Sequence, residues 1–202
     1  MLEKYTPQTV LITGATGDFG KAFAQRFAEL GSKLILIGRS EDKLKALQSE
    51  LGAQTHIAAF DMQDKKGMEA AIKAIPNEFK NIDLLINNAG LALGLDPAQN
   101  CDIEDWETMI AVNNTALVQM TRLILPIMTG NKKGHIINIG STAGSYPYAG
   151  GNVYCATKAF VKMFSLNLRA DLVGTNIRVT NIEPGAIQTQ FSEVRFKGDK
   201  AK

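Results

Sequence analysis

Residues 9–20, with the sequence TVLITGATGDFG, join a short apolar run to a glycine-rich turn and the start of an amphipathic stretch. The run at residues 9–13 lacks polar/apolar alternation, which is typical of a strand buried on both faces of a parallel sheet. After the turn, large apolar residues recur at helical spacing, at Phe19, Phe23, Phe27 and Leu30. The segment therefore predicts a strand, a tight turn and a helix.

The turn has the spacing Gly-x-x-Gly-x-x-Gly. Glycine lets the backbone turn tightly and approach a pyrophosphate, whose charge a helix N-terminus favours. An ordinary glycine-rich turn is the alternative, but the strand–turn–helix context favours phosphate binding. Asp18 would place a carboxylate near the phosphates unless its side chain turns away or caps the helix. The predicted dinucleotide contacts of the turn are Gly14, Thr16, Gly17, Asp18, Phe19 and Gly20.

The same alternation of apolar runs and amphipathic stretches continues along the chain. Further strands are predicted at residues 33–37, 56–60, 84–86, 135–139 and 177–181, and helices at 19–30, 41–51, 65–75, 104–128 and 153–172. Pro126 should kink or shorten the helix at 104–128. Repeated strand–helix units imply right-handed crossovers with helices on both faces of the sheet. We expect residues 1–202 to form a single Rossmann-type, doubly wound α/β domain in three layers.

Composition excludes several classes of function. The chain has 202 residues, of which 45% are hydrophobic and 21% charged, and its net charge is +2, which argues against binding to nucleic acid or a membrane surface through bulk charge. Two cysteines and two histidines, all isolated in the sequence, form neither a disulfide framework nor a metal site. No apolar run reaches the roughly 18 residues of a membrane span. We expect a reduced, cytoplasmic protein without a metal.

Polar residues follow the predicted strands, at the edge where such folds bind their ligands. Arg39 follows the second strand, where an acidic residue would suit the ribose of NAD and an arginine suits the 2′-phosphate of NADP, so we favour NADP over NAD. A solvent-exposed arginine is the alternative. Asp61 and Met62 follow the third strand, and Asn88, Ala89 and Gly90 follow the fourth. All are predicted to line the cofactor site.

The fifth strand is followed by Ser141, and Tyr154 and Lys158 come next on the helix predicted at 153–172. Residues four apart lie on one helix face, and an ammonium near a phenol should lower the pKa of the phenol from about 10. A tyrosine tuned in this way can exchange a proton with a substrate oxygen, to which Ser141 can also hydrogen-bond. A Tyr/Lys pair on a helix is usually only a surface pair. Its convergence with the glycine turn at one sheet edge favours catalysis.

Together these residues resemble the classical branch of the short-chain dehydrogenase/reductase family, from Val10 to about Lys200. The resemblance implies hydride transfer between a nicotinamide and a carbonyl or alcohol carbon. It makes Tyr154 the general acid/base, with Lys158 binding the nicotinamide ribose, Ser141 orienting the substrate oxygen and Asn113 holding a water of the proton relay. It also places four residues beside the nicotinamide: Pro184, Gly185, Ile187 and Thr189.

Within the family, stretches such as NNAGLALG and GHIINIGSTAGSYPYAGGNVY look like the 3-hydroxy acid dehydrogenases, which act on L-allo-threonine, serine and the related semialdehyde. By this analogy the substrate is a small hydroxy or oxo acid of the serine, L-allo-threonine or 3-hydroxypropionate type. Arg195 could pair with its carboxylate or be a surface arginine. The alternatives are a reductase of 3-oxoacyl groups or general carbonyls, and a cofactor-binding protein without catalysis.

Two departures from the family pattern bear on activity. Asp18 stands where the classical turn has its middle glycine. Classical members also continue for several tens of residues beyond the substrate-loop region at about 185–202, with another helix and a last parallel strand. We therefore expect a C-terminally shortened fold, which is either part of a longer natural protein or a shortened form. By the resemblance, helices at about 104–128 and 153–172 would form a homodimer or homotetramer.

Overall fold

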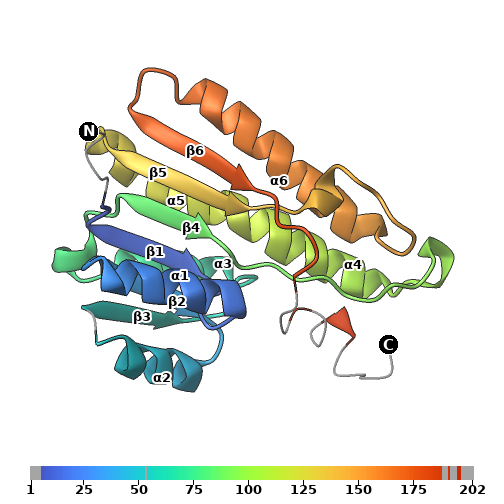
Figure 1. Cartoon of the computed structure of the whole chain (residues 1–202), viewed down its shortest axis with the longest axis horizontal. Helices are drawn as coiled ribbons and strands as arrows, with labels where there is room; N and C mark the ends of the chain where they lie inside the picture. Colours follow the sequence, from blue (N-terminus) through green and yellow to red (C-terminus); the bar gives the residue numbers. More distant parts are fainter. Residues whose placement is uncertain (1–5, 53, 188–190, 192–194, 197–202) are drawn as a thin grey trace.

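The computed structural model describes residues 6–52, 54–187, 191 and 195–196. Its centre is a six-stranded parallel sheet in the order β3-β2-β1-β4-β5-β6 (Figure 1). The strands are β1 (Thr9–Thr13), β2 (Lys33–Gly38), β3 (Thr55–Ala59), β4 (Leu84–Asn87), β5 (Gly134–Ile139) and β6 (Ile177–Ile182). Each lies within one residue of its predicted bounds. The order reverses beside β1, which confirms the predicted doubly wound sheet.

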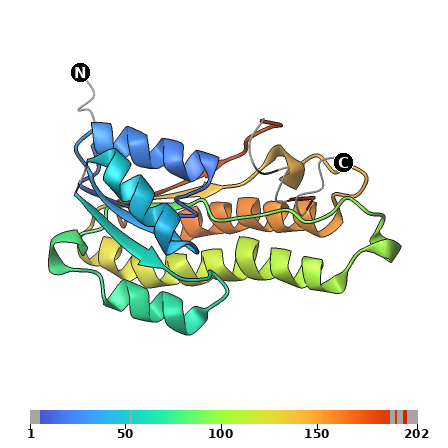
Figure 2. The ribbon, with the colours of Figure 1, turned by 90° about the horizontal axis from the view of Figure 1, so that it is seen from below.

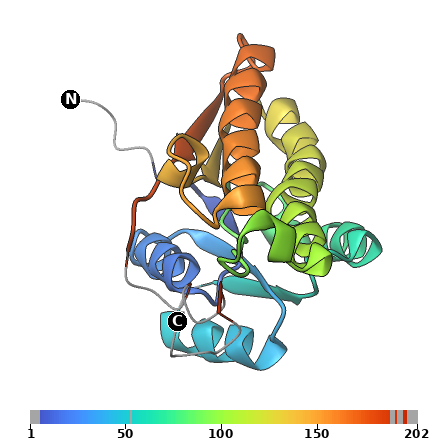
Figure 3. The same cartoon turned by 90° about the vertical axis from the view of Figure 1, so that its right-hand side faces the viewer.

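Helices cover both faces of this sheet, as Figures 2 and 3 show. One face carries α1 (Asp18–Glu29) and α2 (Glu41–Leu51), and the other carries α3 (Lys65–Lys73), α4 (Ile103–Ile110), α5 (Ala116–Gly130) and α6 (Asn152–Asp171). Short 3-10 turns occur at Asn77–Phe79, Ala98–Asn100 and Thr142–Gly144. The three layers α/β/α are those predicted from the sequence.

Strand β1 shows why the apolar runs do not alternate with polar residues. All five of its residues are buried, with Val10 and Ile12 in the core beneath α1 and α2 and Leu11 in the core beneath the other helices. Successive side chains of a strand point to opposite faces, so a sheet covered on both sides needs apolar residues at every position.

The long helix predicted at 104–128 is interrupted. A π-helical turn, Ala111–Thr115, separates α4 from α5. Helix α5 contains Pro126 and continues to Gly130, so the expected shortening at this proline is wrong. Proline removes only one helical N–H, and the turn beyond it stays closed because the Asn131 N–H donates to the Ile127 carbonyl at 3.1 Å.

Within the described part of the chain, no helix is both long and apolar enough to cross a membrane.

Asp83, just before β4, ties three strands together at the edge opposite the site. Its carboxylate accepts the N–H groups of Gln8 and Thr9, both at 3.0 Å, and lies 2.7 Å from the Lys133 ammonium. The residue is 3% exposed. Its own backbone N–H donates to Thr9, and its carbonyl accepts from His135 at the start of β5. A buried carboxylate with these partners organises the start of β1, β4 and β5.

We predict that Asp83→Ala lowers the free energy of unfolding by about 2–4 kcal/mol, because it leaves two backbone donors and a lysine without their acceptor. Urea denaturation followed by circular dichroism measures the change. Glu29→Gln, in an ion pair whose side chains are more than half exposed, is the matched control and should leave the midpoint nearly unchanged. Equal midpoints for Asp83→Ala and the unaltered protein would contradict the prediction.

Candidate active site

Chain segments that are distant in sequence converge at the carboxyl edge of the sheet, which faces the viewer in Figure 3. The turn after β1, the loop after β4, the 3-10 turn after β5 and the start of α6 meet there. In a doubly wound sheet this edge, beside the reversal of strand order, is where ligands bind.

Two glycines of the first turn are required by close packing. Gly14 has a φ of 63°, and a Cβ at this residue would lie 2.9 Å from the Cα of Ala89. A Cβ at Gly20 would lie 2.7 Å from the Cα of Ala15. Gly17 is the N-cap of α1 and has no side chain. The first N–H groups of this helix, at the carboxyl edge of the sheet, therefore have no side-chain acceptor at the N-cap. This arrangement suits a phosphate.

Asp18 is the first residue of α1 and is exposed. It does not cap the helix, because Gly17 has that position. With Thr16 and Lys21 it lines a cleft of about 380 Å³ between α1 and α2. Phe19 is half-buried and packs against the core beneath α1 and α2.

Thr13, which sequence reasoning missed, connects the turn after β1 with the loop after β4. Its hydroxyl accepts the N–H groups of Asn88 and Ala89, both at 3.0 Å. In return, the Asn88 side-chain amide donates to the carbonyls of Thr13 and Gly14, also at 3.0 Å. The structure thus uses Asn88 to hold the turn. A polar residue at the end of an apolar strand was the available signal for Thr13.

The residues predicted after β2 and β3 differ in their placement. Arg39 is exposed at the end of β2. Asp61 is exposed, and its carboxylate accepts the Gln63 N–H at 2.8 Å. Met62 is only 7% exposed, and its side chain belongs to the core beneath α3 and α5. Only the backbone of Met62 therefore remains available to a ligand.

Tyr154 lies at the start of α6 and is 8% exposed. Its phenol is hydrogen-bonded to Ser141, whose hydroxyl also accepts the Ala143 N–H at 3.1 Å. Burial raises the pKa of Tyr154 above its ordinary value, and the hydrogen bond with Ser141 and the charge of Arg195 oppose this only in part. The expected net lowering of the Tyr154 pKa is therefore wrong, because desolvation of the phenolate dominates.

Lys158 lies one turn further along α6 and is 7% exposed. Its ammonium donates to the Ile139 carbonyl at 2.8 Å and lies 5.9 Å from the centre of the Tyr154 ring. Burial lowers the pKa of Lys158 to about 8. A Cβ at Gly90 would lie 3.5 Å from the Lys158 Nζ, so the loop after β4 passes close to the ammonium.

Asn113 lies in the π-helical turn and is 2% exposed. Its side-chain oxygen accepts the Leu91 N–H and its side-chain nitrogen donates to the Leu91 carbonyl, both at 2.8 Å. The same nitrogen donates to the Thr157 hydroxyl at 3.1 Å. The side chain thus joins the loop after β4 to α6, and its assignment to a water of the proton relay stays a prediction.

Arg195 reaches the site from the far end of the chain. Its guanidinium carbon lies 5.6 Å from the centre of the Tyr154 ring and 5.4 Å from that of Tyr148. Nε donates to the Gly94 carbonyl at 3.0 Å and Nη1 donates to the Tyr148 hydroxyl at 2.9 Å, whereas Nη2 is buried without a hydrogen-bond partner. Phe191, which sequence reasoning missed, has its ring 5.7 Å from that of Tyr154.

The segment after β6 also reaches this edge. The Thr142 N–H donates to the Pro184 carbonyl at 3.0 Å, which holds the segment against the turn that follows Ser141. Gly185 is exposed, and Ile187 is 55% exposed. Thr189 lies outside the described residues. Within the described residues no group of three or more His, Cys, Asp or Glu could hold a metal ion.

The chain is similar to known proteins in both sequence and structure. The chain is 57% identical over 194 residues to the NADP-dependent 3-hydroxy acid dehydrogenase YdfG of Escherichia coli, covering 96% of this chain and 78% of the relative. It is 49% identical to the serine 3-dehydrogenase of Rhizobium radiobacter, covering 95% and 77%. A solved closed form of serine dehydrogenase complexed with NADP+ matches with a TM-score of 0.94 at 56% identity, covering 96% and 78%. A family model described as short chain dehydrogenase matches residues 8–200, and the chain therefore belongs to the short-chain dehydrogenase family.

Proposed function

We propose that the protein is an NADP-dependent dehydrogenase that interconverts the hydroxyl of a small 3-hydroxy acid and the corresponding carbonyl. The observation that carries this proposal is the position of the Arg195 guanidinium beside the hydrogen-bonded pair of Ser141 and Tyr154. The names of the relatives, an NADP-dependent 3-hydroxy acid dehydrogenase and a serine 3-dehydrogenase, support the same substrate class.

Arg195 would recognise the carboxylate group of the substrate. Its Nη2 is a buried donor without a partner, and leaving a charged donor unpaired is unfavourable. A substrate carboxylate would supply the missing acceptor through a charge-assisted hydrogen bond. An oxoacyl thioester or a simple ketone has no carboxylate to place there, so this arginine favours a hydroxy acid over those alternatives.

The residues at the carboxyl edge fit a dinucleotide. Gly14 and Gly20 leave no room for side chains, the start of α1 lacks a side-chain cap, and Arg39 is an exposed cation at the end of β2. These residues would hold the diphosphate and the 2′-phosphate, and Lys158 would hold the nicotinamide ribose. When bound, the nicotinamide supplies the acceptor or donor of the hydride.

The proton is handled by residues of this chain. Because burial raises the pKa of Tyr154, its phenol carries a proton near neutral pH and can donate it to a substrate carbonyl oxygen during reduction. In oxidation, which is the reverse step, the phenolate of Tyr154 accepts the proton of the substrate hydroxyl. Ser141 hydrogen-bonds the substrate oxygen, and the nearby Lys158 ammonium favours the phenolate when it forms.

We propose that exposed apolar residues of two helices form the contact between subunits. On α6, Phe160, Met163 and Leu166 are 44%, 58% and 46% exposed, and on α4, Ile103 and Ile110 are 61% and 47% exposed. The exposure of these large apolar side chains supports a homodimer or homotetramer formed through helices at about 104–128 and 153–172. Each copy would act as a single NADP-binding domain.

We predict that Tyr154→Phe lowers the turnover of 3-hydroxypropionate by about 10²–10⁴-fold, because the proton donor is lost. Binding of NADPH, followed by its fluorescence, should be nearly unchanged. Tyr146→Phe is the matched control, since Tyr146 is 73% exposed, and it should retain full turnover. Full activity of Tyr154→Phe would overturn the proposed mechanism.

We predict that Arg195→Ala raises the KM for 3-hydroxypropionate and serine by about 10–100-fold, the usual effect of losing a charge-assisted hydrogen bond. The kcat/KM for a neutral alcohol such as 2-propanol should change little. Arg26→Ala removes an exposed arginine of α1 and serves as the control. Initial rates of NADPH formation are measured for both variants and for the unaltered protein. An equal loss on acids and on the neutral alcohol would assign Arg195 to packing instead.

We predict that Met163→Lys shifts the protein toward the monomer, because a charge on the proposed contact face must be desolvated when that face is covered. Light scattering after size-exclusion chromatography measures the mass. Lys73→Glu on α3 changes the charge outside this face and should leave the mass unchanged. An unchanged mass for Met163→Lys would place the contact elsewhere.

A further inference from the structure

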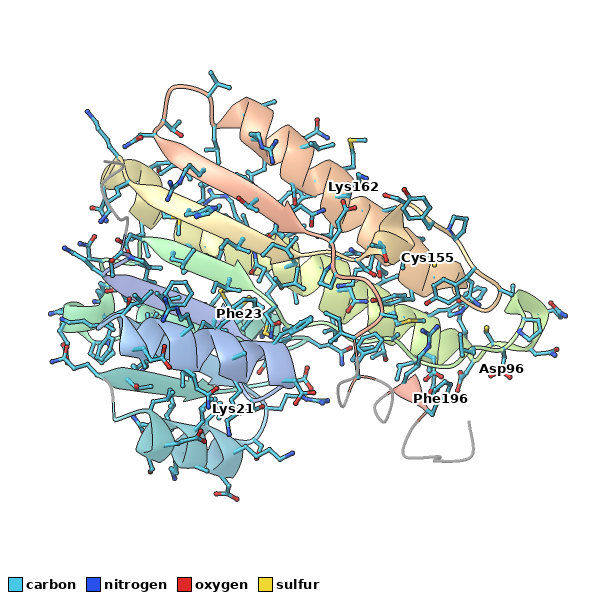
Figure 4. All side chains as sticks on the ribbon, in the orientation of Figure 1. Lys21, Phe23, Asp96, Cys155, Lys162 and Phe196 are labelled. Carbon is cyan, nitrogen blue, oxygen red and sulfur yellow. The ribbon has the colours of Figure 1, made fainter. Side chains whose placement is uncertain are left out.

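Two residues outside the proposed catalytic group hold Arg195 in place. The Arg195 carbonyl accepts the Gly94 N–H, and the Arg195 Nε donates to the Gly94 carbonyl, both at 3.0 Å. The Arg195 Nη1 donates to the Tyr148 hydroxyl at 2.9 Å. The third nitrogen, Nη2, is buried and has no hydrogen-bond partner within the described part of the chain. Asp96 and Phe196, both labelled in Figure 4, mark the loop after β4 and the segment of Arg195 where the two meet.

The two side-chain hydrogen bonds of Arg195 together fix the direction of Nη2. A guanidinium is planar, and its N–H donors have fixed directions within the plane. The bond from Nε to Gly94 alone would leave the plane free to rotate about the Cδ–Nε bond. The bond from Nη1 to Tyr148 removes this freedom. The Tyr148 hydroxyl thus determines where the unpartnered donor of Arg195 points.

Tyr148 is 40% exposed, but its neighbours restrict its position. Its carbonyl accepts the Gly151 N–H at 3.0 Å, and a Cβ at Gly151 would lie 3.1 Å from the Cε2 of the Tyr148 ring. Gly150 has a φ of 75°, and a Cβ there would lie 2.8 Å from the carbonyl carbon of Leu95. The segment of Tyr148 is therefore packed between the start of α6 and the loop after β4.

We propose that Tyr148 is a positioning residue that orients Arg195 so that Nη2 meets the carboxylate of the substrate. Tyr148 thereby contributes to the preference for acids over uncharged substrates. The inference rests on the proposed function, in which Arg195 binds that carboxylate. The Tyr148 ring also lies 5.4 Å from the guanidinium carbon, but a ring contact does not select one nitrogen over another. The positioning role therefore belongs to the hydroxyl.

Two other roles of Tyr148 predict different results. If Tyr148 only packs its loop, its loss affects acids and uncharged substrates equally. If its hydroxyl binds the substrate directly, the loss persists in a protein without Arg195. The positioning role predicts a loss that is confined to acids and that requires Arg195.

The test uses Tyr148→Phe, which keeps the ring and removes the hydroxyl. Initial rates of NADPH formation give KM and kcat for 3-hydroxypropionate and for its methyl ester, which lacks the negative charge. The same constants are measured for Arg195→Ala and for the double variant. Tyr146→Phe is the matched control, because Tyr146 lies two residues away in the chain and is 73% exposed. Thermal unfolding of each variant checks that it is folded.

Tyr148→Phe should raise the KM for the acid by about 3–10-fold at an unchanged kcat, as expected for the loss of one partly exposed hydrogen bond to a charged group. The KM for the ester should stay the same. In the Arg195→Ala background, Tyr148→Phe should cause no further increase, because the two residues act through one interaction. Tyr146→Phe should match the unaltered protein.

An unchanged KM for the acid, an equal increase for the ester, or a further increase in the double variant would each overturn the role of Tyr148. An Arg195→Ala variant with an unchanged KM for the acid, or an unaltered protein that does not turn over the acid, would instead overturn the proposed function.

Discussion

The close approach of the turn after β1 to the loop after β4 is the constraint on which the site depends. At Gly14 the two segments are so near that a Cβ would lie 2.9 Å from the Ala89 Cα, and Thr13 and Asn88 exchange hydrogen bonds across the gap. Strands β1 and β4 are neighbours, but the helices that follow them cover opposite faces of the sheet. The chain therefore separates at this point, where doubly wound folds bind their ligands, and the backbone groups there are ones that only small residues leave accessible.

Burial governs the protonation of Tyr154 and Lys158 on α6. Tyr154 and Lys158 are both nearly inaccessible, and desolvation moves their pKa values toward the neutral form of each group, upward for the phenol and downward for the ammonium. The raised pKa of Tyr154 favours the protonated phenol. The Arg195 guanidinium adds a positive charge beside the Tyr154 ring.

The sequence predicted the strands to within one residue because a sheet covered on both faces demands uninterrupted apolar runs, which few other structures tolerate. It also predicted the meeting of Ser141 and Tyr154, since strand ends share one edge. It did not predict the π-helical turn, the place of Met62 in the core or the raised pKa of Tyr154. Each of these depends on which residues pack around the position, and helical periodicity or chain order carries no such information.

The side chain of Asn113 links the loop after β4 to helix α6 through hydrogen bonds. Its amide oxygen and nitrogen bind the N–H and the carbonyl of the single residue Leu91, as the backbone of a neighbouring strand would. One planar side chain thereby makes the two hydrogen bonds that a neighbouring strand would make. Its nitrogen also donates a hydrogen bond to the Thr157 hydroxyl. The loop after β4 is thus aligned with α6 by a rigid group of fixed length. The distance between the loop after β4 and α6 is consequently set by the length of one side chain and its three hydrogen bonds.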